Sequence, residues 1–564
     1  METYTNADAF VDVLNAHSVD KIFFNPGGEF IGLQSRIAQS RLAGREAPQL
    51  VLCLDESVPV SAAHGSYMIS GKPQVVLVHS ELGTLQMGGN LQNVQWGRVP
   101  MVIMAAYQAD DHRTTWRQEP YDQAWIVRGN MKRDRRIAGD EDLDVILTEA
   151  FRIACTEPTG PVYLYFPFGY LERAIDKPAT PPAPAKIAPL PAADPAALGE
   201  AADLLLDALN PLIVAGFAGR HPENVDALVR LAETLSAPVL TGQVWMNFPS
   251  DHPLCLGMEQ IGGSRKPNPG IAEADVILAI DYDMPYVAGI GMPAPGAKII
   301  HIDVDPLTNG RLLWERGADL FINADSRLVV PALERLLRQR ITSEKRHELH
   351  ERYRRLETEH RETRRGWRAF AQSQESQEPV SPDWLCRCID QAIDADTIVV
   401  NHTISHCASV TEQIERTKPG TLLGCPAGAI GWAMGASLGA KMAAPEKTVV
   451  ATLTDGGFVW GCPTSTLWTA VKYGASFLAV VFNNRGYGIL RGSQEQVLAV
   501  DGLTEEYIFE AGVEFMPDYA AIAGACGAYG RTVEEPADVL PALREALARV
   551  RAGQVAVLDV RLGR

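Results

Sequence analysis

Short runs of apolar and β-branched residues alternate with longer helical stretches along this 564-residue chain, and this alternation constrains the fold more than any other feature. Such runs are typical of strands buried on both faces, and their alternation with helices predicts parallel sheets covered by helices. The predicted fold class is therefore α/β. The expected strands are residues 21–24, 49–54, 74–80, 99–106, 161–167, 211–216, 237–242, 275–281, 298–305, 397–401, 448–457, 477–484 and 555–562.

Two segments divide the chain into blocks. Residues 172–195 contain seven prolines, which favours an extended connector. Residues 341–380 are dense in Arg, Glu and His and then turn polar, which predicts an exposed helix followed by a linker. We therefore expect three domains, each a mainly parallel sheet covered by helices, with a Rossmann-like domain in the middle; their ranges are 1–175, 196–340 and 380–564.

Charge and cysteine content narrow the function classes. The chain carries 51 basic and 69 acidic residues, a net charge of −18, which disfavours binding to nucleic acid or to an anionic membrane. Nine cysteines, with no C-x-x-C pair, indicate neither a disulfide framework nor a zinc knuckle. The N-terminus lacks the pattern of a signal peptide, and the apolar runs are too short for membrane spans. We expect a cytoplasmic protein.

Polar residues at two strand ends in the third block suggest a metal site. One expected strand ends in Asp455-Gly456-Gly457, and the strand 29 residues later ends at Asn484, with Gly486 close behind. This spacing allows one crossover helix, so both side chains can lie at one edge of the sheet. Carboxylate and amide oxygens suit Mg²⁺, and the glycines let backbone N–H groups approach a diphosphate. The alternative is a pair of ordinary strand-end turns.

The same segment resembles the signature of thiamine-diphosphate enzymes, a G-D-G followed some thirty residues later by N-N. The whole chain is similar to the decarboxylase and acetohydroxyacid-synthase group, and to benzoylformate decarboxylases in particular. The resemblance implies that Asp455, Asn484 and the backbone of Gly486 bind Mg²⁺. Two departures are visible: Thr454 replaces the first glycine, and two residues are inserted before Trp468.

The resemblance also assigns the contacts of thiamine diphosphate. It makes Ile430 the apolar wedge under the bent cofactor and gives the backbone of Gly428 to the aminopyrimidine. Thr403 and Ser405 stand where diphosphate contacts are expected.

In the first block, Asp55-Glu56 ends a strand and precedes a helical stretch closed by glycine. Alone, such an acidic pair is usually a helix cap. The resemblance makes Glu56 the acid that protonates the pyrimidine ring, reaching it across a subunit interface. A homodimer at least follows from the resemblance, and a homotetramer is favoured.

Four further residues concern the substrate. The resemblance places Gly28 opposite the reacting carbon, where benzoylformate decarboxylases have serine and acetohydroxyacid synthases glycine. It places His79 where the decarboxylases have a catalytic histidine, although a lone strand-end histidine is more often structural; imidazole titrates near neutral pH and can carry a proton. Tyr107 stands where a pocket glutamine is expected, with Gln108 next to it. A second histidine, expected in residues 283–288, has no counterpart.

These observations predict an enzyme that uses thiamine diphosphate and Mg²⁺ to break or form a C–C bond next to a carbonyl. Non-oxidative decarboxylation of a 2-oxo acid, with carboligation to a second carbonyl, is the main hypothesis. An acetolactate-type synthase and a lyase of a 2-hydroxy ketone or 2-hydroxyacyl-CoA are alternatives, and a non-catalytic ligand-binding protein is a rival from another class. FAD or ADP in the middle domain is possible, but a domain without a nucleotide is favoured.

Overall fold

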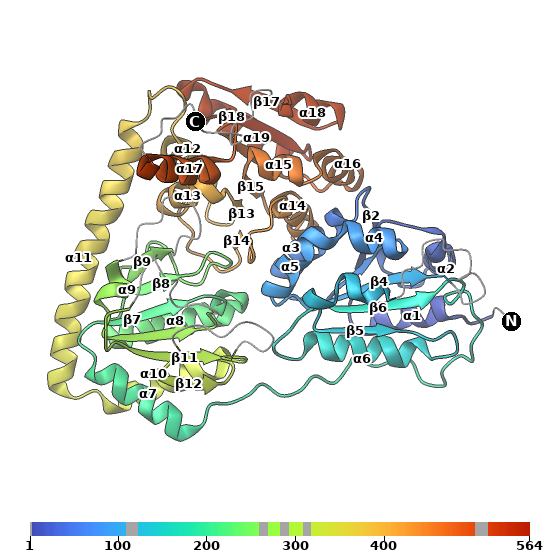
Figure 1. Ribbon diagram of the computed structural model, residues 1–564, viewed down its shortest axis with the longest axis horizontal. Helices are drawn as coiled ribbons and strands as arrows, with labels where there is room; N and C mark the ends of the chain where they lie inside the picture. Colours follow the sequence, from blue (N-terminus) through green and yellow to red (C-terminus); the bar gives the residue numbers. More distant parts are fainter. Residues whose placement is uncertain are drawn as a thin grey trace.

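The computed structural model describes residues 3–108, 122–258, 269–282, 293–307, 317–501 and 517–563. It contains three six-stranded sheets in three domains, with every strand pair parallel, which confirms the predicted fold class (Figure 1). In the described residues, no helix has both the length and the apolar character needed to cross a membrane.

The first domain has the strand order β2-β1-β3-β4-β6-β5. Its strands are β1 (Lys21–Phe24), β2 (Gln49–Leu52), β3 (Gln74–Leu77), β4 (Met101–Tyr107), β5 (Arg133–Arg136) and β6 (Val162–Pro167). Its helices are α1 (Asn6–Ala16), α2 (Ile31–Leu42), α3 (Ser57–Ser70), α4 (Ser80–Gln86), α5 (Gly88–Trp96) and α6 (Leu143–Cys155), with a 3₁₀ turn η1 (Gly28–Phe30).

The middle domain has the order β12-β11-β10-β7-β8-β9, the doubly wound arrangement of a Rossmann-like sheet. Its strands are β7 (Pro211–Ala215), β8 (Val239–Thr241), β9 (Cys255–Met258), β10 (Val276–Ile280), β11 (Lys298–Asp303) and β12 (Leu320–Asn323). Its helices are α7 (Pro195–Asp207), α8 (Pro222–Leu235), α9 (Pro269–Glu273) and α10 (Ser326–Arg340).

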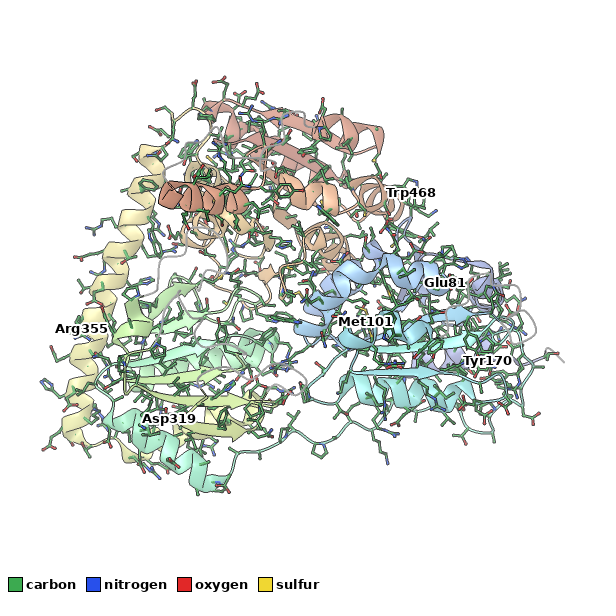
Figure 2. The ribbon with its side chains drawn as sticks, viewed as in Figure 1. Glu81, Met101, Tyr170, Asp319, Arg355 and Trp468 are labelled. Atoms are coloured by element: carbon green, nitrogen blue, oxygen red, sulfur yellow. The ribbon has the colours of Figure 1, made fainter. Side chains whose placement is uncertain are left out.

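A single long helix, α11 (Ser343–Ser373), runs from the middle domain along the edge of the molecule to the third domain (Figure 1). Its charged sequence leaves most side chains in solvent, and Arg355 points outward from it (Figure 2). The predicted exposed helix is confirmed.

The third domain repeats the strand order of the first, as β14-β13-β15-β16-β18-β17. Its strands are β13 (Ile398–His402), β14 (Leu422–Gly424), β15 (Val449–Thr454), β16 (Leu478–Asn483), β17 (Tyr529–Val533) and β18 (Ala556–Arg561). Its helices are α12 (Pro382–Ala392), α13 (Cys407–Gln413), α14 (Trp432–Ala443), α15 (Asp455–Trp460), α16 (Pro463–Tyr473), α17 (Gly488–Asp501), α18 (Tyr519–Ala525) and α19 (Val539–Arg551).

Helices α3 and α14 join the first and third domains side by side (Figure 1). Glycines let their backbones approach closely: a Cβ on Gly439 would lie 1.7 Å from the carbonyl oxygen of Ala62, and one on Gly65 would lie 2.0 Å from that of Ala436. One hydrophobic core continues across this contact, so the two domains share their apolar interior.

Candidate functional site

The expected cofactor residues of the third domain follow four neighbouring strands, in the order β14, β13, β15 and β16. Since all four strands are parallel, these residues share the carboxyl edge of the sheet, where ligands bind in open α/β sheets. The residues concerned are Gly428 and Ile430 after β14, Thr403 and Ser405 after β13, Asp455, Gly456 and Gly457 after β15, and Asn484 and Gly486 after β16.

The predicted metal ligands are brought together at this edge. The carboxylate of Asp455 accepts hydrogen bonds from the backbone N–H groups of Gly456 (2.6 Å) and Gly486 (3.1 Å). Burial raises the pKa of the Asp455 carboxyl above its usual value, and these N–H donors act in the opposite direction. A divalent cation would stabilise the buried carboxylate.

Asn484 supplies a second oxygen. Its side-chain Oδ1 is buried and has no hydrogen-bond partner among the described residues. A Cβ on Gly488 would lie 2.9 Å from Asn484 Nδ2 and 3.3 Å from Ser405 Oγ, so these two side chains meet at the N-terminus of α17. A buried amide oxygen beside a buried carboxylate fits a hard cation such as Mg²⁺.

The loop after β13 is strained. Ile404, a β-branched residue, has φ +45°, and it lies between Thr403 and Ser405. Such a conformation is costly, and strained backbone gathers at ligand sites. Both ring nitrogens of neighbouring His402 are buried without a partner in the described part of the chain, and burial lowers the pKa of His402 to about 4.

The departure at Thr454 has a structural reason. Thr454 is the N-cap of α15, and its hydroxyl accepts a hydrogen bond from the N–H of Gly457 at 3.0 Å. The side chain thus satisfies a backbone group that would otherwise lack a partner at the helix start.

The expected catalytic residues of the first domain also share one sheet edge. Gly28, Glu56, His79 and Tyr107 lie at the carboxyl ends of β1, β2, β3 and β4, which are neighbours in the order β2-β1-β3-β4. A Cβ built on Gly28 would have no heavy atom within 4 Å in the part of the chain that the structure describes.

His79 is held by a carboxylate that the sequence did not single out. Glu29, whose side chain is fully buried, lies with Oε1 3.0 Å from His79 Nδ1, and it also accepts from the N–H of Ser80. A Cβ on Gly27 would lie only 1.9 Å from His79 Nδ1, so this glycine is required by the close approach. Ser80 has φ +43°, a second point of strain.

Glu56 occupies the N-cap position of α3 without a side-chain capping bond. Its side chain lies against α4, where a Cβ on Gly83 would be 2.9 Å from Glu56 Oε1. Because α4 follows His79 directly, the structure brings Glu56 and His79 to neighbouring positions. Gln108 follows β4 and is half-buried.

Tyr107 is packed into its own domain. Its hydroxyl donates to the carbonyl of Ile137 at 3.0 Å, and Arg136 lies over its ring at 4.3 Å. His112, Trp116 and Arg117 follow in the sequence and could line the substrate pocket or be ordinary surface loop residues. They lie outside the described residues, as do residues 283–288.

At the carboxyl edge of the middle sheet, side chains of the first domain make ion pairs. Arg98 binds Asp303 at the end of β11 (2.8 Å), and Glu157 binds Arg220 (2.9 Å). These four side chains are nearly or fully buried. In doubly wound sheets this edge is where a nucleotide binds.

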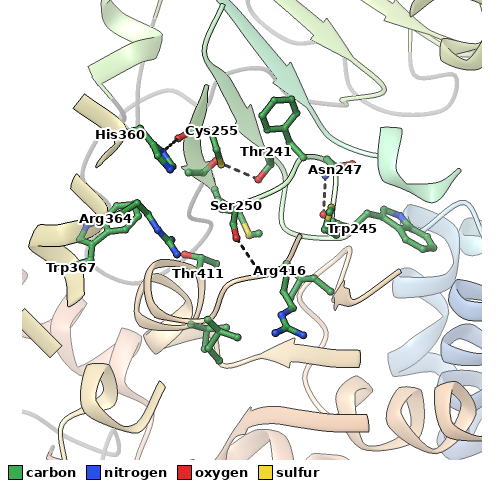
Figure 3. Close-up of a pocket in the computed structure, with 17 residues that line it drawn as sticks. Thr241, Trp245, Asn247, Ser250, Cys255, His360, Arg364, Trp367, Thr411 and Arg416 are labelled. Carbon is green, nitrogen blue, oxygen red and sulfur yellow. Dashed lines mark hydrogen bonds between the residues drawn. The ribbon is translucent and has the colours of Figure 1, made fainter. Parts of the chain in front are cut away.

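A small hollow lies where the middle domain, α11 and the third domain meet (Figure 3). Trp245 and Trp367 line it, together with Arg364 and Arg416. It holds about 40 Å³, enough for a few water molecules, whereas ligand pockets enclose roughly 300–1,000 Å³.

The third domain places candidate oxygen ligands at the carboxyl edge of its parallel sheet, and the first domain places an acid–histidine pair at the carboxyl edge of its own sheet. This arrangement is typical of cofactor-dependent enzymes built from paired α/β domains. Sequence profiles of thiamine pyrophosphate enzymes match the chain three times: the N-terminal TPP binding domain at residues 4–126, the central domain at 198–333 and the C-terminal TPP binding domain at 404–560. The chain belongs to the thiamine pyrophosphate (thiamine diphosphate) enzymes.

Individual proteins and solved structures are similar to almost the whole chain. The chain is 25% identical to the acetolactate synthase isozyme 3 large subunit of Escherichia coli, over 99% of this chain and 95% of that protein. It is 26% identical to the acetolactate synthase large subunit of Corynebacterium glutamicum, over 97% and 85%. Among solved structures, the 4-hydroxybenzoylformate decarboxylase of Rhodococcus jostii matches with a TM-score of 0.80 and 21% identity over 99% of both chains. The benzoylformate decarboxylase of Polynucleobacter necessarius matches with 0.79 and 21%, over 99% and 98%.

Proposed function

We propose that this thiamine-diphosphate enzyme decarboxylates a 2-oxo acid without oxidation and can pass the resulting acyl unit to a second carbonyl. The observation that carries the proposal is that buried Asp455 and the Oδ1 of Asn484, which has no partner among the described residues, share one sheet edge in the third domain. The first domain adds an acid–histidine pair suited to proton transfer. An acetolactate-type carboligase is the second candidate, favoured by the relatives and by glycine at position 28. A lyase of a 2-hydroxy ketone or 2-hydroxyacyl-CoA remains a further variant.

Asp455, Asn484 and the backbone of Gly486 would hold Mg²⁺, and the cation would hold the diphosphate with Thr403, Ser405 and the amides of Gly456 and Gly457. Gly428 would hold the aminopyrimidine through its backbone, and Ile430 would support the bent cofactor. When bound, thiamine diphosphate supplies a nucleophilic carbon and an electron sink for C–C cleavage. The protein supplies position and protons.

Two acidic groups of the first domain have separate tasks in this proposal. Glu56 would hold the pyrimidine ring of the bound cofactor through a shared proton and so would control its tautomer. Glu29 holds His79 through Nδ1 at 3.0 Å, and the imidazole so positioned would exchange a proton with the substrate. Tyr107 and Gln108 were predicted to line the pocket; the bonded hydroxyl of Tyr107 favours Gln108 for direct contact.

We also propose that Glu56 acts across a subunit interface, in a homodimer or homotetramer. Large apolar side chains close to Glu56 are exposed in the single chain: Leu54 by 52%, and Leu82 and Leu85 on α4 by 50% and 57%. Apolar surface of this kind is typical of a contact with another protein, here a second copy.

The remaining assignments follow the sequence. We keep the domain limits 1–175, 196–340 and 380–564, a cytoplasmic location and a middle domain that works without FAD or ADP. The buried ion pairs at the carboxyl edge of the middle sheet support the last point, because a nucleotide would have to displace them.

The test measures binding before activity. Thiamine diphosphate with Mg²⁺ should raise the melting temperature of the wild type, and a screen of 2-oxo acids, with and without an aldehyde acceptor, should yield CO₂ and aldehyde or acyloin. Asp455→Asn should lose the Mg²⁺-dependent stabilisation. Asp396→Asn, an exposed carboxylate in the same domain, is the matched control and should keep it. If no melting shift and no product appear with any substrate, the protein is a non-catalytic member and the proposal fails.

A further inference from the structure

The loop between β14 and α14, residues 425–431, is the part of the third domain proposed to touch the aminopyrimidine. Gly428 has φ +76° and Gly431 φ +94°, so the loop has a specific, non-repetitive backbone. A Cβ on Gly428 would meet no heavy atom of the described residues within 4 Å, so no described side chain packs against this turn at Gly428.

One side chain from the first domain does hold it. Asn93, on α5, accepts hydrogen bonds at Oδ1 from the N–H groups of Ala427 and Ala429, both at 3.3 Å, and its Nδ2 donates to the carbonyl of Ala429 at 3.1 Å. The thiol of Cys425 donates to the same Oδ1 at 3.1 Å. The two alanines flank Gly428 directly.

Both hydrogens and the oxygen of the Asn93 side-chain amide take part in hydrogen bonds. Its second hydrogen reaches Oδ1 of Asn90 at 3.3 Å, and Asn93 itself is fully buried. A buried amide whose donors and acceptor are all hydrogen-bonded has one favoured orientation. Removing it would leave the N–H groups of the loop without an acceptor. Asn93 and its partners in the loop lie more than 330 residues apart in sequence, so these hydrogen bonds depend on how the first domain packs against the third.

We propose that Asn93 is a positioning residue that presets the cofactor loop of the third domain, so that the docking of the first domain sets the affinity for thiamine diphosphate. This inference rests on the proposed placement of the aminopyrimidine at Gly428. A loop already held in its binding conformation loses less freedom on binding, which raises affinity without any direct contact between Asn93 and the cofactor.

The experiment compares two neighbours on α5. Asn93→Leu removes every bond to the loop while keeping the side chain's approximate size. Val94→Ala is the control, because Val94 is also fully buried on the same helix but belongs to the apolar core. Asn93→Asp keeps the acceptor for both alanine N–H groups and serves as the conservative variant.

Two readouts are needed. Hydrogen exchange of a peptide covering residues 425–431, in the protein without cofactor, should be faster in Asn93→Leu and unchanged in Val94→Ala. The Kd for thiamine diphosphate, from tryptophan fluorescence at saturating Mg²⁺, should rise at least about tenfold in Asn93→Leu, stay within about twofold in Val94→Ala, and recover in large part in Asn93→Asp.

Several results would overturn the inference: unchanged loop exchange, an unchanged Kd, or a Kd that weakens equally in Val94→Ala and so follows general destabilisation. If the wild type itself binds no thiamine diphosphate, the proposed function fails, and the exchange measurement still decides whether Asn93 clamps the loop.

Discussion

The glycine contact between α3 and α14 gives the sharpest test of how the site is built. In Gly439→Ala, the new Cβ would lie 1.7 Å from the carbonyl oxygen of Ala62 and 2.8 Å from the nitrogen of Ser66. Both are backbone atoms, so no side chain can turn aside. The helices must separate by roughly 1.5 Å to restore ordinary contact at about 3.2–3.5 Å.

Overpacking of this kind costs about 3 kcal/mol, and the better helix propensity of alanine returns about 1 kcal/mol. The net loss of about 2 kcal/mol corresponds to roughly 4–8 °C in melting temperature for a domain of this size. Calorimetry or circular dichroism would measure it. Because α14 begins just after the proposed cofactor loop, the Kd for thiamine diphosphate should weaken as well.

Gly366→Ala is the matched control. Gly366 is also inside a helix, but it is exposed on α11, and a Cβ there would meet nothing within 4 Å. This variant should melt at or slightly above the wild-type temperature. If Gly439→Ala melted as high as Gly366→Ala, the close approach of α3 and α14 would be refuted.

Three further predictions concern other contacts. Gly27→Ala should lower the melting temperature by several degrees, because the new Cβ would overlap the His79 ring, whereas Gly28→Ala should leave the melting temperature within about 1 °C of the wild type. Differential scanning fluorimetry compares the two variants, and equal melting temperatures would contradict the geometry. Burial lowers the pKa of His64 to about 3, so the unfolded chain takes up a proton below pH 6.5 that the folded chain refuses, and stability falls as pH drops toward 3. That loss is about 2 kcal/mol at pH 5, and urea titrations should show a flatter pH dependence in His64→Asn. Arg98→Met strands buried Asp303 and should cost about 3–5 kcal/mol, most of which Arg98→Met/Asp303→Asn recovers; a double variant as unstable as the single one would argue against the ion pair.

The central strands could be predicted from sequence, and several edge strands could not. Residues of β16 are all buried and apolar except its last, so the run is plain in the sequence. The strands that the pattern missed, β5, β9, β12, β14 and β17, all lie at sheet edges. There one side of the strand lacks a neighbour and polar residues are tolerated. The basic sequence of residues 131–136 is typical of a solvated turn, and that interpretation is wrong for Arg133–Arg136, which form the charged edge strand β5.

Some residues of the candidate site could likewise be proposed from the sequence, and others could not. Asp455 and Asn484 could be proposed from the sequence because glycine-flanked polar residues end apolar runs. Glu29 and Asn93 could not, because their roles come from contacts with partners 50 and more than 330 residues away. The only local signal for Glu29 is its place after a Gly-Gly turn at a strand end.

The shared core of the first and third domains has a consequence for the nascent chain. Helix α3 begins at Ser57, but α14, which covers it, begins at Trp432, some 375 residues later. At synthesis rates of about 5–20 residues per second, the face of α3 that packs against α14, which carries Ala62 and Gly65, stays uncovered for roughly 20–75 s. The middle domain, which has its own core, can fold during this interval. The first domain can also form its own second core, but the apolar interior that it shares with the third domain stays incomplete during this interval and is then most open to aggregation.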